Sequence, residues 1–512
     1  RPVVLLCADE GEGERLARDL ESLTGQRVPV LAPRSYIFHN AATVSRQWEH
    51  RRLALMRAMA AGEVPLLVAA VEGLLQRTLP PEELDRAWAE LRTGGSYDLN
   101  QLAETLTAAG YSRCDQVEGV GQFALRGGIL DVYSPGMEQP VRAEFFGDEL
   151  DAMGLFDPAT QRRTENVERA VLLPAAEALP HLAPGGTAGL AARLEKLAAG
   201  AEKAGRHELA QTLRQDREAL EQGRSFPATD RYLALIYPQL ATAADYLPPD
   251  ACVLFSESSR VGERAKTYQW QLEEDAKSLM ERGELDGSCA VLSRTFPELN
   301  ARLSDWPTAY LDSFTLSAYP VPPGCLLSVT AKQLPSFGAS LETAVSDLDH
   351  YQRSGLGTLV LVSSEQRALN LQTLLREQGL RAAVEFQPQT LPGPGETLVS
   401  VGGLSAGMEY PEARLAVLTE GQGAALKKPR PRKAATNREK LKSYADLSPG
   451  DLVVHEHHGV GRYMGMVKLP ADGVEKDYVK IAYAGSDVLY VPATQLDLVS
   501  KYIGGGEDAA ET

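Results

Sequence analysis

The stretch VVHEHHGVGRY, at residues 453–463, places three histidines and a glutamate in four consecutive positions. On a strand, His455 and His457 would project from the same face about 7 Å apart, as an H-x-H metal chelate requires. No cysteine lies nearby, and Asp451 is the only other candidate ligand in phase with the pair. The alternative is a half-exposed strand that ends in a Gly-Val-Gly turn. We favour the turn and predict no metal site, a choice that elemental analysis would test.

Nucleotide chemistry has no strong signal in the sequence either. A phosphate-binding loop of the type G-x-x-x-x-G-K-[ST] needs a Gly-Lys pair, and the chain contains none. The stretch GVGQFALRGG, at residues 119–128, holds a lone G-x-G in a β-rich context, where glycines more commonly serve turns than a dinucleotide. We therefore predict no catalytic residue and no bound cofactor in this chain.

Composition limits the class of protein. The chain has 512 residues, 44% of them hydrophobic, and a formal net charge of −17, which argues against a protein that grips nucleic acid over most of its surface. Its five cysteines are scattered and never form a C-x-x-C pair, a pattern typical of reduced thiols in the cytoplasm. No apolar run approaches about 20 residues, so we expect no membrane partner.

Apolar periodicity predicts a multidomain α/β protein. Strand-to-helix patterns at 2–23 and 65–76 indicate a first α/β domain with a parallel sheet, and 88–174 reads as a β-rich insertion into it. A strand at 357–364 and a helix at 364–379 indicate a second α/β domain. The predicted divisions are 1–87 and 175–318 for the first domain, 88–174 for the insertion, 319–424 for the second domain, 425–443 for a basic linker, 444–504 for a C-terminal module and 505–512 for a tail.

The C-terminal module combines short strands with a final helical pattern. In DYVKIAY, at residues 477–483, Val479 and Ile481 fall on one face of a strand. In TQLDLVSKYIG, at residues 494–504, Leu496, Val499 and Ile503 favour a closing helix. Several strands of four to six residues within about sixty positions indicate a small SH3/Tudor-like β-barrel.

Segments from two regions of the chain resemble a known family. LSPGDLVVHEHHGVGRYMGM and DYVKIAYAGSDVLYVPATQLDLVSKYIG resemble the RNA-polymerase-interacting domain of the bacterial transcription-repair coupling factors (Mfd), which is shared with CarD-type regulators. GQFALRGGILDVYSPGMEQPVRAEFFGDELDAMGLFDPATQRR is similar to the domain that this family shares with the excision-repair protein UvrB and uses to dock UvrA. The resemblance covers essentially the whole chain. It implies a degenerate UvrB/helicase-like domain 1, the inserted domain 2, the α/β domain 3 and the CarD-like barrel.

The resemblance also implies two sets of contact residues. Arg126, Arg142 and Phe146 match the UvrA-contacting positions of the family. Arginine and exposed aromatic side chains commonly dominate interface energies. The alternatives are that either phenylalanine of the pair at 145 and 146 belongs to the core, and that the arginines are ordinary surface charges.

On the C-terminal module, Met466, Val467 and Leu469 are the candidates for binding RNA polymerase. The family pairs an edge strand of this domain with the β-subunit of RNA polymerase, so the contact would be β-augmentation. Leu469 matches a family contact position, although it could equally be part of the barrel core.

These implications lead to one functional hypothesis and two competitors. The chain is expected to be the N-terminal portion of a coupling factor that joins stalled RNA polymerase to UvrA in transcription-coupled nucleotide excision repair. ATP, magnesium and DNA would be bound by motor domains that follow in the family and lie beyond this chain. An active UvrB-like ATPase or helicase and a CarD-type transcription regulator are the alternatives.

Overall fold

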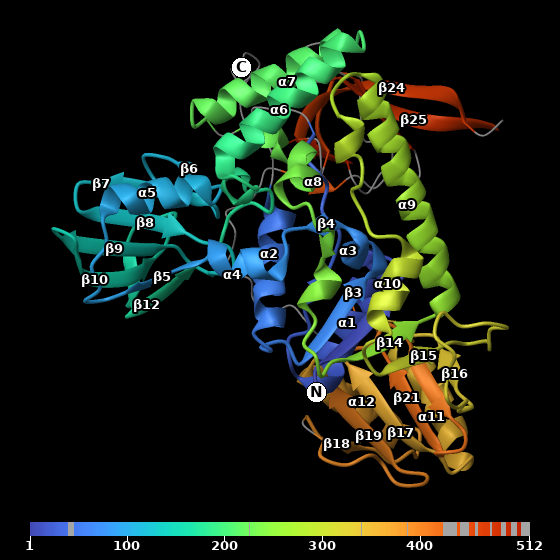
Figure 1. Cartoon of the computed structure of the whole chain (residues 1–512). Helices are drawn as coiled ribbons and strands as arrows, with labels where there is room; N and C mark the ends of the chain where they lie inside the picture. Colours follow the sequence, from blue (N-terminus) through green and yellow to red (C-terminus); the bar gives the residue numbers. More distant parts are fainter. Residues whose placement is uncertain are drawn as a thin grey trace. The chain divides into compact units, whose positions relative to one another are not determined.

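The computed structural model describes residues 1–38, 46–224, 226–338, 340–386, 388–422, 438–440, 450–455, 459–471, 474–482, 488–492 and 499–502. The chain divides into two compact units, Arg1–Ala425 and Leu426–Thr512 (Figure 1). Of the helices in the described ranges, none combines the length and apolarity that crossing a bilayer takes.

A five-stranded sheet forms the centre of the first α/β domain. Its order is β15-β14-β1-β3-β2, and every neighbouring pair is parallel. Because both faces of a parallel sheet are covered, its strands are apolar throughout. The strands are β1 (Val3–Cys7), β2 (Val30–Leu31), β3 (Leu66–Ala70), β14 (Cys252–Ser256) and β15 (Thr308–Leu311). The parallel sheet expected from the apolar pattern is confirmed.

Helices surround this sheet and share its core. Helix α1 begins after Asp9, whose side chain accepts a hydrogen bond from the Glu12 N–H, and it ends at Gly25 in the left-handed conformation. The stretch at 188–222 forms two helices, α6 and α7, that lie side by side in Figure 1. The helices are α1 (Glu10–Thr24), α2 (Gln47–Ala60), α3 (Val71–Leu75), α4 (Pro81–Ala87), α6 (Gly186–Lys203), α7 (His207–Glu221), α8 (Leu233–Ile236), α9 (Ser258–Glu281) and α10 (Phe296–Leu303).

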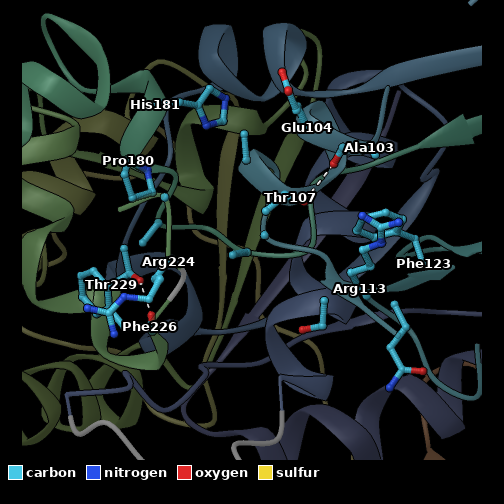
Figure 2. A pocket seen from close by; sticks show the side chains of 18 of the residues that line it. Ala103, Glu104, Thr107, Arg113, Phe123, Pro180, His181, Arg224, Phe226 and Thr229 are labelled. Carbon is cyan, nitrogen blue, oxygen red and sulfur yellow. Dashed lines mark hydrogen bonds between the residues drawn. The ribbon is translucent and has the colours of Figure 1, made fainter. Parts of the chain in front are cut away.

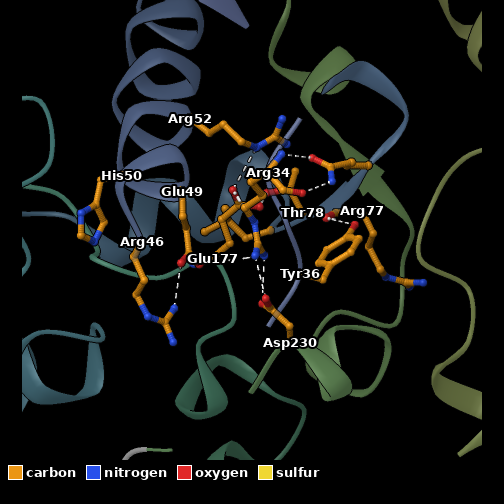
Figure 3. Close-up of polar contacts among 12 residues, drawn as sticks. Arg34, Tyr36, Arg46, Glu49, His50, Arg52, Arg77, Thr78, Glu177 and Asp230 are labelled. Carbon is orange, nitrogen blue, oxygen red and sulfur yellow. Dashed lines mark hydrogen bonds and ion pairs between the residues drawn. The ribbon is translucent and has the colours of Figure 1, made fainter. Parts of the chain in front are cut away.

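A cluster of buried charges ties distant segments of this domain together (Figure 3). The Arg34 guanidinium contacts the Asp230 carboxylate at 2.7 Å and the Glu177 carboxylate at 3.1 Å, and Arg52 contacts Glu177 at 3.1 Å. These side chains are almost fully buried. Since Glu177 lies where the chain returns from the insertion, the cluster fixes that return segment to the first domain; removing one partner would leave a buried charge unpaired.

The insertion is mainly an antiparallel sheet in the order β11-β10-β9-β8-β7-β6 with one helix against it. Only the short β6–β7 pair is parallel. The β-rich expectation is confirmed. The elements are α5 (Leu99–Ala108), β6 (Ser112–Arg113), β7 (Gln122–Arg126), β8 (Ile129–Tyr133), β9 (Val141–Phe146), β10 (Glu149–Phe156), β11 (Arg163–Asn166), and the pair β5 (Ala89–Arg92) with β12 (Arg169–Leu172). Outside the insertion, β4 (Arg77–Thr78) pairs with β13 (Ala241–Thr242) in the first domain.

The second α/β domain has its own sheet and core. Strands β18, β19, β17 and β21 run parallel; β20 pairs antiparallel with β21, and β16 pairs antiparallel with β20. The helix expected at 364–379 is confirmed as α12, capped by Ser364. The elements are β16 (Lys332–Leu334), α11 (Leu341–Arg353), β17 (Gly357–Val362), α12 (Glu365–Glu377), β18 (Ala383–Val384), β19 (Thr397–Val401), β20 (Gly407–Tyr410) and β21 (Leu415–Thr419).

The described part of the C-terminal unit is an antiparallel sheet in the order β22-β27-β23-β24-β25-β26. Val479 and Ile481 are buried on one face, as their alternation predicts. Arg438–Lys440, inside the expected basic linker, form the edge strand β22, and the other residues of that linker lie outside the described ranges. The other strands are β23 (Leu452–His455), β24 (Gly459–Ala471), β25 (Val474–Ala482), β26 (Val488–Pro492) and β27 (Val499–Tyr502).

Two expectations for this unit are wrong. Val499–Tyr502 form a strand that pairs with β22 and β23, not part of a closing helix, because backbone pairing to neighbouring strands overrides the local helical periodicity. The expected Gly-Val-Gly turn is also absent, since Gly459, Val460 and Gly461 open β24 and pair with β23. The residues that connect the two strands, His457 among them, lie outside the described ranges.

Candidate protein-interaction sites

The insertion presents one face of its sheet away from its core. Across the strands Arg126 pairs with Ile129, and Asp131 with Arg142. Because directly paired residues share a face, and so do residues two apart on a strand, Arg126, Ile129, Asp131 and Arg142 all lie on one side. The residues between them, Leu130 and Val132, are buried in the core on the other side. We call this side the outer face of the insertion.

A single buried carboxylate fixes both predicted arginines on the outer face. Asp131 is fully buried and accepts hydrogen bonds from Arg142 at 2.7 and 2.8 Å and from Arg126 at 2.7 Å. The hydrogen bond to Asp131 raises the pKa of Arg142, whose guanidinium also lies over the Phe156 ring at 4.7 Å. The Arg142 side chain is 22% exposed and that of Arg126 is 51% exposed. Arg142 therefore also has a structural role, and Arg126 offers more accessible charge.

The adjacent residues Phe145 and Phe146 differ in burial. Phe145 packs into the core with its ring edge-to-face against Tyr97 at 6.2 Å between centroids. Phe146, the next residue on the strand, is 86% exposed and precedes the hairpin turn at Gly147, where φ is 63°. The core alternative is thus correct for Phe145 and wrong for Phe146. Ile129 is 38% exposed on the same face. The sequence prediction did not include it, although a residue two positions before Asp131 on a strand must share its face.

A cleft of about 1080 Å³ lies beside the insertion (Figure 2). Its wall includes α5, the segment around Pro180 and the end of α7, and it carries Arg113 and Arg224. The His50 Nε2–H donates to the Ala175 carbonyl at 2.9 Å, and burial lowers the pKa of His50 to about 4. Burial also lowers the pKa of His181. At neutral pH these histidines are therefore uncharged parts of the junction between the insertion and the first domain.

Carboxylates occupy the edge of the first sheet where doubly wound folds commonly bind nucleotides, the carboxyl ends of β1 and β14. Asp9 caps α1 there, and Asp312 accepts hydrogen bonds from the Ser258 amide and hydroxyl. Arginines lie at this edge too, since Arg15 and Arg260 both form ion pairs with Glu12. The Asp-Glu-x-Asp sequence at 148–151 forms the turn before β10 and its first residues, and β10 pairs antiparallel with β9 in the insertion.

The C-terminal sheet offers a strand border. Strand β23 pairs with Gly459–Arg462, and Tyr463 extends this side by donating to the Asp451 carbonyl at 2.8 Å. After a bulge between Tyr463 and Gly465, the rest of β24 pairs with β25 on one side. On its other side, residues 464–471 have no strand partner within the ranges that the structure describes. This border contains all three candidate positions for polymerase contact.

Along this border, Met466 is 39% exposed and stands opposite the buried Val479. Val467 is half-buried opposite Tyr478, and Leu469 occupies the position opposite Lys476. The role of Leu469 as an interface residue stays a prediction. Among the described residues, no group of three or more His, Cys, Asp and Glu side chains is placed to hold a metal ion; His457 falls outside them.

Comparison with known proteins matches both regions. Residues 89–177 match the family model for the UvrB interaction domain, and residues 447–503 match the CarD-like/TRCF RID domain. The transcription-repair-coupling factor of Bacillus subtilis is 32% identical over 515 residues, which covers 98% of this chain and 43% of that protein. The factor of Staphylococcus haemolyticus is 32% identical over 477 residues, or 90% and 39%. The chain thus spans about two fifths of the length of these relatives.

Proposed function

We propose that this chain is an adaptor in transcription-coupled nucleotide excision repair. The chain belongs to the transcription-repair-coupling factor family and corresponds to its N-terminal portion. The chain would join RNA polymerase to UvrA. One observation carries the proposal: the two matched interaction domains lie on one chain, the UvrB interaction domain in the first compact unit and the CarD-like/TRCF RID domain in the second.

The outer face of the insertion is the proposed UvrA site. Phe146 and Ile129 are apolar side chains held out of the core on hairpin ends, and Arg126 stands beside them with its guanidinium anchored by Asp131. Aromatic and arginine side chains are the common residues of interface hot spots, and the Arg126 side chain, already held by Asp131, loses little conformational entropy on binding.

The border of β24 at 464–471 is the proposed polymerase site, with Met466, Val467 and Leu469 at its centre. A strand from the β-subunit would extend the sheet, and backbone hydrogen bonds would supply much of the affinity. We further propose that the unit closes into an SH3/Tudor-like barrel. The CarD-type alternative accounts for this unit alone and leaves the first unit without a role.

The family-level activity is also a proposal for this protein. ATP-dependent translocation on DNA, with ATP and magnesium as cofactors, would belong to parts of the longer relatives that this chain does not span. The chain by itself would hydrolyse no ATP, and it would work in the cytoplasm.

A binding assay on immobilised UvrA tests the proposal. Phe146→Ala should weaken retention of the chain about 30-fold, since truncating a hot spot costs roughly 2 kcal/mol or more. Phe314→Ala is a matched control, because Phe314 is 83% exposed but lies outside the insertion; it should bind like the unchanged chain. Equal retention of all three proteins would reject the proposed UvrA site.

A further inference from the structure

The two α/β domains of the first unit pack around separate cores. One set of buried clusters contains β1, β3 and their helices, and another contains β17, β19, β21 and theirs. Within the described residues, no hydrophobic cluster joins the two sheets. Residues 312–331 connect the domains without helix or strand. Such a connection can reach about 60 Å when extended, so the chain allows the domains to separate.

Polar contacts close the gap between the domains, and they converge on helix α1. The Asp19 carboxylate accepts hydrogen bonds from the Ser405 amide and the Ser405 hydroxyl, both at 2.6 Å, and from the Gln422 side-chain amide at 2.7 Å. The Gln422 amide also donates to the Arg15 carbonyl at 2.9 Å. One turn along α1, the Ser22 hydroxyl accepts from the Gly403 amide at 3.2 Å.

The partners of α1 come from one edge of the second domain. Gly403 and Ser405 follow β19, and Gln422 follows β21, so both loops lie at the carboxyl ends of parallel strands. A cavity of about 450 Å³ adjoins these contacts, lined by Leu16, Leu23 and Met408 among others. The contact is therefore incompletely packed, and Leu23 beside it is 61% exposed.

We propose that α1 and these two loops form a releasable latch, centred on Asp19, which docks the second α/β domain on the first. Polar interfaces between domains of one chain permit relative motion, because little apolar surface must be exposed when they part. Opening would free residues 332–422 to move as a body on the 312–331 connection. Gln422 is the last residue of this body. Because opening breaks its hydrogen bonds to α1, it would also release the beginning of the segment that leads to the C-terminal unit.

Hydrogen exchange resolved to single amides in the full chain tests the latch. Asp19→Ala removes the acceptor of the Ser405 amide directly, so faster exchange at Ser405 is expected from any model. The informative site is the Gly403 amide, which bonds to Ser22 and not to Asp19. A latch predicts that Gly403 also exchanges at least about tenfold faster, because both contacts open together, while amides within Gly357–Val362 keep their protection.

Glu14→Ala is the matched control, since Glu14 is an exposed carboxylate on the same helix and does not contact the second domain; it should leave both amides unchanged. Faster exchange at Ser405 alone would overturn the proposal, because the contacts would then be independent. If Asp19→Ala also deprotects Gly357–Val362, Ser22→Ala decides: a latch requires the Ser405 amide to accelerate in that variant, and an unchanged rate would overturn the proposal.

Discussion

The two proposed docking surfaces use different parts of the polypeptide. The outer face of the insertion offers side chains, two of which are arginines held by a buried carboxylate, on a sheet with a packed core behind it. The 464–471 border of β24 offers backbone groups on a strand that is paired on one side among the described residues. A side-chain surface should therefore be sensitive to single truncations, whereas a backbone border should tolerate truncation and respond to groups that obstruct pairing.

The largest effect is expected at the backbone border. Leu469→Arg would place a charge at the proposed strand junction, where it must lose water for the partner strand to approach, and RNA polymerase binding should fall about 100-fold. UvrA binding should not change. Surface plasmon resonance on both partners measures this. Leu23→Arg, which changes an exposed leucine on α1, is the control. If Leu469→Arg binds polymerase with unchanged affinity, the border of β24 is not the polymerase site.

A smaller effect separates the two arginines of the outer face. Arg142→Ala should lower the free energy of unfolding by about 2 kcal/mol, because the buried Asp131 loses two hydrogen bonds. Arg126→Ala should lower it by less than about 1 kcal/mol, since its side chain is half exposed and Asp131 keeps Arg142. Urea unfolding followed by circular dichroism compares them. Equal losses would mean that Asp131 does not anchor the face as described.

The smallest effect is expected at His50, in the junction between the insertion and the first domain. Burial lowers the pKa of His50 from its usual 6.5 to about 4. Between these pH values His50 is protonated in the unfolded chain but not in the folded chain. Stability should therefore decrease as pH falls from 6.5 toward 4, by about 1 kcal/mol at pH 5.5. His50→Gln can keep the hydrogen bond to Ala175 and should flatten this dependence in urea titrations at pH 7.5 and 5.5. An unaltered slope would contradict the assignment to His50.

Local patterns predicted much of this molecule. Apolar runs located β1, β3 and β17, and strand alternation required one of Phe145 and Phe146 to face inward. These features depend on neighbouring residues, so periodicity carries them. The family match supplied the candidate contact residues, of which Arg126, Phe146 and Met466 are exposed; their roles stay predictions.

Contacts between distant residues were beyond sequence reasoning. The helical spacing of Val499 gave no indication that β23 would pair with it, and Asp131 showed no local sign of holding two arginines. Asp19 and Ser405 lie 386 positions apart, and no periodicity links them. Each of these features is decided by which segments the fold brings together, and a single sequence does not record that.

Bridging by one chain is the central claim, and a capture assay tests it directly. RNA polymerase is immobilised, UvrA is added, and retained UvrA is measured with and without this chain. The account predicts that UvrA is retained only when the chain is present, and that either Leu469→Arg or Phe146→Ala strongly reduces the amount retained. Retention of UvrA undiminished by both substitutions, or release of the chain from the immobilised polymerase whenever UvrA binds, would contradict it.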